Sequence, residues 1–125
     1  MAAGWDLYAL CETVVPKGAS TFIATGLAVA IPEGWEGQIR CRSSLGKKGM
    51  ILPNGVGTID ADYRGELKVL ATWIGQGDSF TVTKGERVAQ LLFAQVPKVT
   101  IVETSYEELG NTERGSGGFG SSGQY

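Results

Sequence analysis

Short runs rich in β-branched and aromatic residues alternate with glycines along most of the chain, and helical periodicity is nearly absent. The glycines recur at intervals of roughly 8 to 12 residues, which is typical of the short strands of a sandwich or barrel. We expect at most one helical turn, at residues 43–48. The predicted strands are residues 21–31, 36–42, 66–74, 79–83, 87–96 and 99–104. The pattern therefore predicts an all-β chain folded as an antiparallel β-sandwich.

One predicted strand, residues 67–74, is apolar on both faces of an extended chain. Such a strand is covered on both sides rather than exposed to water on one. Two interpretations exist for what covers the second face of this strand: the interior of the same sandwich, or a contact with another subunit. Both stay open for Leu67, Val69, Trp73 and Leu91, because periodicity alone does not separate a core from an interface.

The overall composition excludes several classes of function. The chain has 125 residues, a formal net charge of −2, two cysteines and no histidine. The missing histidine excludes a Ser-His-Asp triad and a His-ligated zinc site, so any catalysis depends on carboxylates, hydroxyls, Arg and Lys. The charge balance argues against a partner that is nucleic acid. The two cysteines lack CxxC spacing, which suits a reducing cytoplasm, with the nucleus or an organelle left open.

Hydropathy and composition also predict how the chain is divided. No apolar run approaches the roughly 18 residues of a transmembrane helix, so we expect a soluble protein with no membrane partner. The composition changes at Gly110, which predicts one β domain at residues 1–109 and a flexible arm at residues 110–125. Ordering such a glycine-rich arm costs roughly 1 to 2 kcal/mol per residue, so it stays mobile unless a ligand binds it.

Two side chains of the arm indicate what that ligand is. Arg114 offers a planar fork that matches phosphate, and Phe119 offers a face for a flat ring. The glycine and serine N–H groups between them suit an anion. Together they favour a nucleotide. The alternative is a disordered terminus or a Gly/Ser linker without function.

Residues 40–49 have the composition of a phosphate-binding loop. They follow a predicted strand and bring four cations and two hydroxyls together around two glycines. The order of a Walker loop is missing, and a solvated charged turn is the alternative interpretation.

Residues 54–65 carry the candidate acid–base chemistry. Asp60 and Asp62 share a face if the chain is extended, with Tyr63 close behind. One of the two carboxylates can take a proton from water as a general base. The alternative is an Asp-Tyr-Arg-Gly turn stabilised by its own ion pair.

Five segments, taken in order, resemble the motifs of the trimeric dUTP pyrophosphatases, or dUTPases. They are residues 3–7, 42–45, 57–65, 85–90 and 114–123, so the resemblance spans nearly the whole chain. It implies a homotrimer of distorted jelly-roll subunits with the β-clip fold, whose three active sites each draw on all three chains. The implied reaction is hydrolysis of dUTP to dUMP and pyrophosphate, which keeps uracil out of DNA and supplies dUMP for thymidylate synthesis.

The resemblance also implies residue roles. Asp60 activates the water that attacks the α-phosphorus, and Arg114 reaches the γ-phosphate. Asp6 and Gln90 act through water on a Mg²⁺ carried by the triphosphate. Tyr63 excludes a 2′-hydroxyl, Asn54 and the neighbouring backbone read uracil, and a narrow hairpin rejects the thymine methyl group. The residues implied to bind substrate are Arg42, Ser43, Ser44, Asn54, Gly57, Ile59, Tyr63, Gln90, Phe119, Gly120 and Ser121.

Three departures from the family pattern leave details open. Ser44 stands where many members have glycine, and we expect it to add a hydroxyl contact to phosphate. The loop 42–54 is one residue shorter than in some members, so the match of Lys47 or Lys48 to the family lysine stays open. The first motif begins at residue 3, without the strand that usually precedes it, which leaves the pairing of the first strand open. Two rival functions are a dCTP deaminase and a non-catalytic nucleotide-binding or signalling module of the same fold.

Overall fold

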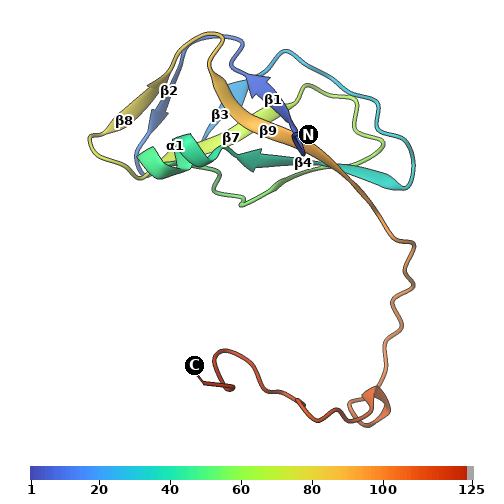
Figure 1. The fold of residues 1–125 in the computed structure, drawn as a ribbon. Coiled ribbons are helices and arrows are strands. Elements are labelled where there is room, and N and C mark those ends of the chain that lie inside the picture. Colours follow the sequence, from blue (N-terminus) through green and yellow to red (C-terminus); the bar gives the residue numbers. More distant parts are fainter. Residues whose placement is uncertain (124–125) are drawn as a thin grey trace.

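The computed structural model describes residues 1–123, and strands dominate it (Figure 1). In chain order the elements are β1 (Trp5–Tyr8), β2 (Thr13–Pro16), β3 (Thr21–Ala24), β4 (Trp35–Cys41), α1 (Ser43–Lys48), β5 (Met50–Ile51), β6 (Gly57–Ile59), β7 (Lys68–Trp73), β8 (Ser79–Val82), β9 (Arg87–Gln95) and the 3₁₀ turn η1 (Glu107–Leu109). The predicted helical turn is confirmed as α1.

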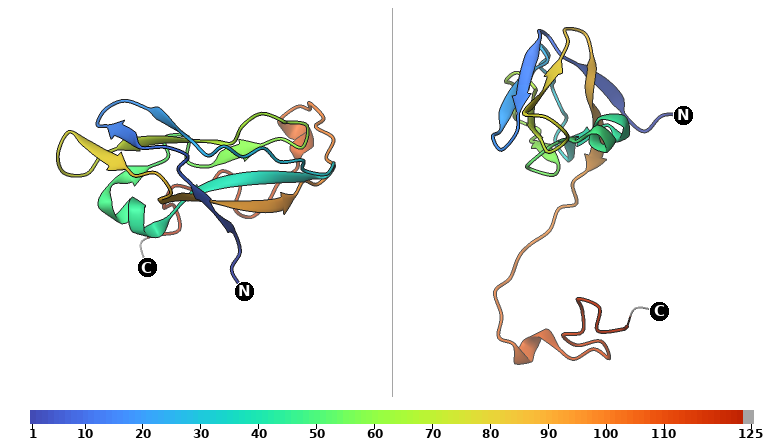
Figure 2. Two further views of the ribbon diagram at one scale, coloured as in Figure 1. Left: turned by 90° about the horizontal axis from the view of Figure 1, so that it is seen from above. Right: turned by 90° about the vertical axis from the view of Figure 1, so that its left-hand side faces the viewer.

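The strands form three antiparallel sheets. One has the order β1-β9-β4-β6, another β3-β7-β5, and a third pairs β2 with β8. The views in Figure 2 show the sheet that contains β4 and β9 on one side of the body and β3 and β7 on the other. The predicted all-β antiparallel sandwich is therefore confirmed.

The core lies between these sheets and is continuous. It includes Leu7, Ile39 and Leu91 from one sheet and Ile23 and Val69 from another. Along β7 the buried positions alternate with less buried ones, as expected when one face of a strand packs inward.

The structure decides between a core and a subunit interface for the four apolar residues that the sequence left open. Leu67, Val69, Trp73 and Leu91 are 0%, 0%, 6% and 5% exposed within the single chain. They belong to the core of one sandwich and are not available for a subunit contact.

Several predicted boundaries differ from the structure. The run 21–31 is a strand only to Ala24, because the Thr25 hydroxyl then donates to the Leu67 carbonyl and Gly26 adopts a φ of 73°. The predicted set lacks the short strands β1, β2, β5 and β6. The sequence left the pairing of the first strand open, and in the structure β1 pairs with β9.

The predicted strand at residues 99–104 is wrong. These residues adopt no strand conformation, and Val99, Ile101 and Val102 are 73%, 93% and 75% exposed. A strand exists only when its backbone groups are paired, and high β-propensity does not replace a partner.

After β9 the chain leaves the body (Figure 1). Among the described residues, the bond from the Val96 N–H to the Gly34 carbonyl, at 2.8 Å, is the last that ties the chain to the body. The boundary at residues 109 and 110 stays a prediction. The arm's last residues, Gln124 and Tyr125, lie outside the described part of the chain. In residues 1–123 no helix is long and apolar enough to cross a membrane.

Two glycines hold the end of α1 against β7. Gly49 ends the helix with a φ of 120°, and its carbonyl accepts a 2.8 Å bond from the N–H of Ile74. A Cβ added to Gly75 would clash with the carbonyl of Lys48 and with the ring of Trp73. The position of the helix therefore depends on the absence of a side chain at residue 75.

We expect Gly75→Ala to lower the free energy of unfolding by about 1 to 3 kcal/mol, because the added methyl overpacks a rigid backbone contact. Urea unfolding measures the change. The control is Gly46→Ala, a substitution inside α1. The added Cβ would make an ordinary 3.4 Å contact with Cys41 Sγ. Replacing a helical glycine by alanine stabilises by roughly 0.5 to 1 kcal/mol, so the two variants should differ in sign. A Gly75→Ala protein as stable as the parent contradicts the packing argument.

Candidate active site

Three of the five motifs meet in one chain because β9 pairs with both β1 and β4. In the register of these strands Gln90 lies opposite Asp6 on one side and opposite Arg40 on the other. β4 then leads directly into Arg42 and α1. The result is a cavity of about 360 Å³, lined by Asp6, Arg42, Ser43, Ser44 and Gln90.

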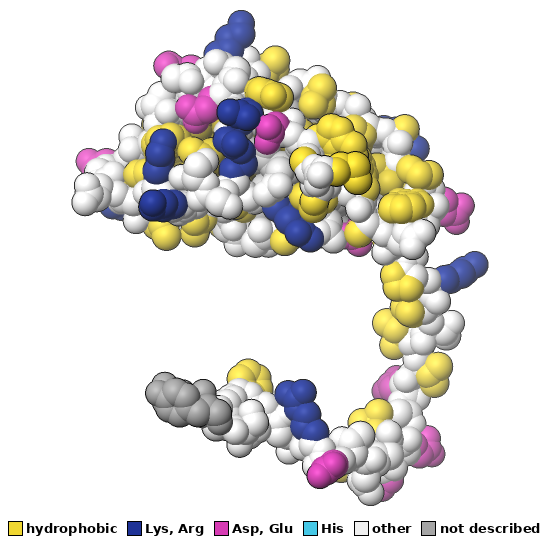
Figure 3. All heavy atoms as spheres, viewed as in Figure 1, with side chains coloured by type: hydrophobic (Ala, Val, Ile, Leu, Met, Phe, Trp, Pro, Cys, Tyr) yellow, Lys and Arg dark blue, Asp and Glu magenta, His cyan; other side chains and the backbone are white. Residues whose placement is uncertain are grey.

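The charges of this first cavity are arranged around Asp6. Its Oδ1 lies 3.5 Å from Arg42 Nε and its Oδ2 lies 3.6 Å from Arg87 Nη1. Arg42 Nη1 also donates to the carbonyl oxygen of Arg87 at 3.4 Å. Within residues 1–123 these are the only ion pairs. Figure 3 shows Lys and Arg side chains beside Asp and Glu side chains on the body.

Gln90 is fixed in the cavity by its own amide. Its Nε2 donates a 3.1 Å hydrogen bond to the carbonyl oxygen of Cys41. This bond uses one of the two N–H donors of the amide, and the amide oxygen can act as an acceptor. Ser43 and Ser44 are exposed at the first two positions of α1, and Lys47 and Lys48 are exposed in its last turn. No contact distinguishes the two lysines.

The donor set of the first cavity limits the kind of metal site. The described residues contain no group of three or more His, Cys, Asp or Glu side chains that could hold a metal ion. The oxygen donors of the side chains that line the cavity are the carboxylate of Asp6, the amide of Gln90 and the hydroxyls of Ser43 and Ser44. Mg²⁺ usually keeps several waters and binds through one or two carboxylates and substrate phosphates. This set fits a hydrated Mg²⁺ that arrives with a triphosphate.

A second cavity forms where β6 ends. It measures about 140 Å³ and is lined by Thr58, Ile59, Asp60, Tyr63, Glu66 and Lys68. The Tyr63 N–H donates to the Asp60 carbonyl at 3.1 Å, so the chain turns at Asp60. The prediction that Asp60 and Asp62 share a face of an extended chain is therefore wrong.

The predicted ion pair within this turn is also wrong. Arg64 Nη1 donates to the carbonyl oxygens of Ala61 at 2.6 Å and Tyr63 at 3.1 Å. Arg64 thus stabilises the turn through the backbone, and Asp60 and Asp62 remain outside any ion pair among the described residues. Asp62 lines a different cavity, together with Ile31, Glu33, Ala61 and Arg64.

The ring of Tyr63 is held in one position. Its hydroxyl donates a 2.9 Å hydrogen bond to the carbonyl oxygen of Glu66. A Cβ on Gly65 would stand 2.5 Å from that hydroxyl. The ring folds back over residue 65, and this is possible only because residue 65 has no side chain.

Asn54 lies in a turn between two sheets. The N–H of Gly55 donates to the Leu52 carbonyl, and Gly55 has a φ of 74°. On either side of the turn, β5 pairs with β7 whereas β6 pairs with β4. The strands that flank Asn54 therefore belong to different sheets, and the role of Asn54 stays a prediction. Gly57 begins β6 opposite Ile39.

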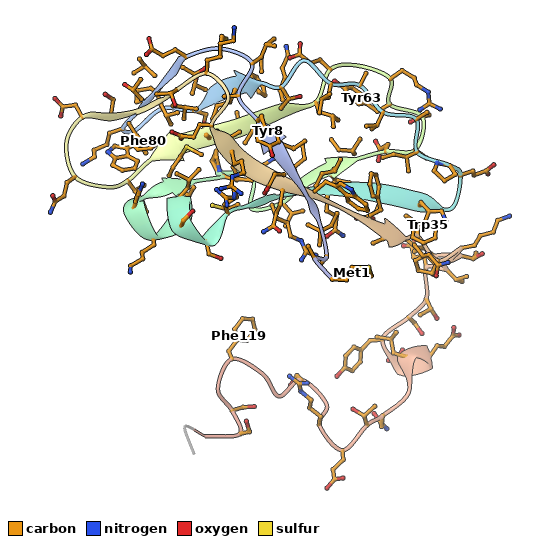
Figure 4. All side chains as sticks on the ribbon, turned by 45° about the horizontal axis from the view of Figure 1, so that its top comes forward. Met1, Tyr8, Trp35, Tyr63, Phe80 and Phe119 are labelled. Carbon is orange, nitrogen blue, oxygen red and sulfur yellow. The ribbon has the colours of Figure 1, made fainter. Side chains whose placement is uncertain are left out.

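The arm carries its residues away from both cavities. Arg114 Nε donates to the Gly117 carbonyl at 2.6 Å, and Ser121 N–H donates to the Gly118 carbonyl at 3.0 Å. Phe119 has a φ of 53°, and Gly120 follows with a φ of 85°. Figure 4 shows Phe119 apart from the body that holds Tyr63. One chain therefore separates the predicted site residues into three places.

Three residues near these cavities had no role in the predictions. Glu66 and Lys68 line the second cavity, and Arg87 pairs with Asp6. Arg87 belongs to the segment 85–90, and this membership is the one sequence signal that could have indicated it.

The β-sandwich gathers an arginine, two hydroxyls, an amide and a carboxylate around one cavity, and two carboxylates, a phenol and a lysine around another. These groups suit the binding and cleavage of a phosphorylated nucleotide. The fold and the site thus define a nucleotide hydrolase. The comparisons are more specific: a family model described as dUTPase matches residues 1–123, so the chain belongs to the dUTPase family.

Relatives and solved structures agree with this assignment. The chain is 51% identical to a deoxyuridine 5′-triphosphate nucleotidohydrolase of Syntrophotalea carbinolica, over 98% of this chain and 83% of that protein. A structure of a Staphylococcus bacteriophage 80alpha dUTPase mutant with dUpNHpp has a TM-score of 0.79 at 27% identity and covers 99% and 88% of the two chains. The dUTPase of Streptococcus mutans has a TM-score of 0.74 at 29% identity and covers 79% and 82%. These likenesses confirm the predicted family and its distorted jelly-roll fold.

The thiol beside the first cavity has a perturbed environment. Cys41 Sγ lies 3.4 Å from the carbonyl oxygens of Arg42 and Met50. Burial raises the pKa of this thiol, and a hydrogen bond from the backbone of Gly46 opposes the rise. The neutral thiol is therefore favoured in the folded state more than in the unfolded state.

We expect the Cys41 thiolate to form at a higher pH in the native protein than in the unfolded protein. The measurement is the rate of alkylation against pH in a Cys11→Ser variant, with and without urea. Because the folded pKa is the higher one, the thiol's contribution to stability is present at neutral pH and is lost as the pH rises through that pKa. Coincident native and unfolded profiles contradict this expectation.

Proposed function

We propose that this chain hydrolyses dUTP to dUMP and pyrophosphate. The observation that carries the proposal is the first cavity, where Asp6, Arg42 and Gln90 come together from three segments far apart in the sequence. Membership of the dUTPase family supports the same reaction. Neither a deaminase nor a non-catalytic module is favoured by any contact of the described residues.

Asp60 is the proposed general base. Its carboxylate takes a proton from a water molecule, whose oxygen bonds to the α-phosphorus while the bond from that phosphorus to the bridging oxygen of pyrophosphate breaks. Base catalysis of this kind contributes about 10²- to 10⁴-fold. The turn at Asp60 supports this role, because it leaves the carboxylate at a cavity and outside any ion pair among the described residues.

The first cavity is the proposed phosphate site. Arg42 offers a charged fork, and Ser43 and Ser44 offer hydroxyl donors at the cavity wall. Asp6 and Gln90 would hold Mg²⁺ through its waters. When bound, the ion would neutralise the charge of the triphosphate and help orient it.

The second cavity and the arm supply the proposed selectivity. The fixed ring of Tyr63 would lie against deoxyribose and leave no room for a 2′-hydroxyl. Asn54 and neighbouring backbone would read uracil. Phe119 would stack on the base, which contributes about 1 to 3 kcal/mol.

The three groups of residues would meet in a homotrimer. Each site would take its phosphate cavity from one subunit, Asp60 and Tyr63 from the second and the arm from the third. An apolar surface supports association: Trp5, Trp35 and Phe93 are 64%, 39% and 39% exposed, and Trp35 and Phe93 line a hollow of about 420 Å³. The cytoplasmic location stays a prediction.

We expect rapid, Mg²⁺-dependent release of pyrophosphate from dUTP, and little release from dTTP, dCTP or UTP. Asp60→Asn should bind dUTP and lose turnover by about 10²-fold or more, because an amide cannot accept the proton. The control is Asp62→Asn, which removes a neighbouring carboxylate that lines a different cavity. Equal cleavage of all four nucleotides, or equal loss in the two variants, would overturn the assignment.

We expect a chain that ends at Glu113 to keep its melting temperature and to turn over dUTP slowly. Every hydrogen bond of residues 110–123 has both partners within the arm, so its loss removes no contact with the body. Arginines that reach transferred phosphates contribute roughly 10³- to 10⁵-fold in related chemistry. Full activity of the shortened chain would exclude the arm from catalysis.

Mixing two inactive variants tests whether subunits share a site. Asp60→Asn chains keep the arm and shortened chains keep Asp60, so a trimer assembled from both contains some complete sites. We expect the refolded mixture to exceed the summed activity of its components. A mixture that only equals this sum contradicts a shared site.

A further inference from the structure

Arg87 reaches Asp6 because of an irregularity in β9. The register between β1 and β9 shifts after Leu7, so that Leu7 lies opposite Ala89 but Tyr8 lies opposite Arg87. Val88 is thereby left without a partner on β1. In a regular strand residues 87 and 90 would point to opposite faces. A bulge reverses this alternation, so Arg87 comes to the face that carries Gln90 and Asp6.

The contacts of Arg87 link the two charged residues of the first cavity. Its guanidinium contacts Oδ2 of Asp6 and its carbonyl oxygen accepts a bond from Arg42. The Arg87 side chain is 55% exposed and does not line the cavity. Any influence of the Arg87 side chain on a ligand in the cavity therefore passes through Asp6.

The two oxygens of Asp6 have different partners. Oδ1 is paired with Arg42 and Oδ2 with Arg87. A triphosphate in the cavity competes with Oδ1 for Arg42, because phosphate is also a strong acceptor for a guanidinium. When Arg42 turns to phosphate, the contact at Oδ2 is unaffected and keeps the carboxylate in place.

We propose that Arg87 is a positioning residue for the first cavity: it holds Asp6 while Arg42 is released to the phosphates of the nucleotide. This inference rests on the proposed function. It assigns the Arg87 side chain an effect on binding rather than on the chemical step, since this side chain acts through Asp6.

The test is Arg87→Gln, with Arg87→Lys as the conservative variant and Lys84→Gln as the control for loss of an exposed charge three residues away. We expect Arg87→Gln to raise KM for dUTP about three- to fivefold, in line with a partly exposed ion pair, and to leave kcat within twofold. Arg87→Lys should recover part of the loss, and Lys84→Gln should match the parent.

A binding measurement gives a readout that does not depend on turnover. Calorimetric titration with dUpNHpp, with Mg²⁺ and with EDTA, should show the same loss of affinity for Arg87→Gln. In an Asp6→Asn background the substitution should have no further effect, because the residue through which Arg87 acts is gone. A change of melting temperature alone would not produce this dependence on Asp6.

Three outcomes would overturn the inference: an unchanged KM in Arg87→Gln, an equal loss in the Asp6→Asn background, or a loss confined to kcat. Failure of the proposed function is a separate result. It would appear as a parent protein that neither cleaves dUTP nor binds dUpNHpp, whatever the state of Arg87.

Discussion

The pairing of β9 with both β1 and β4 is the constraint on which the rest of the structure depends. This nine-residue strand contributes Val88, Ala89 and Leu91 to the core and Gln90 to the first cavity. A register slip of one residue would move every side chain to the opposite face, so the cavity and the core cannot be altered independently. The hydrophobic burial that stabilises the sandwich therefore also fixes the position of Gln90 against Asp6.

Within one chain the first cavity, the second cavity and the arm lie apart, and this separation has an energetic consequence. A cavity that already contained a carboxylate base, two arginines and a stacking aromatic would have to bury or order all of them without substrate. In the proposed mechanism the arm stays solvated until a nucleotide binds, and the entropy of ordering it is then offset by binding energy. Opening of the arm and release of product would be part of each turnover.

The parts of the fold and site that could be predicted are those with local signals. Strands such as β4 and β9, the turn of α1 and the phosphate-type loop at Arg42 are visible in composition and spacing. The errors and the omission have two causes: some features depend on a partner remote in sequence, and others depend on local backbone bonds that a pattern of side chains does not show. Residues 99–104 have β-propensity but no partner strand, the turn at Asp60 is set by a backbone bond to Tyr63, and the place of Arg87 follows from a bulge opposite β1. The likeness to a family supplied the roles, which no local pattern could.

Residue 65 illustrates a restriction that backbone angles would not indicate. Gly65 does not have a positive φ, so its conformation is open to any residue, yet a Cβ there would meet the hydroxyl of Tyr63. Every single-base change of a glycine codon that replaces the residue introduces a Cβ. The gene therefore has no neighbouring missense variant at this codon that preserves the tyrosine in its present position. Any substitution at residue 65 therefore requires the ring of Tyr63 to shift.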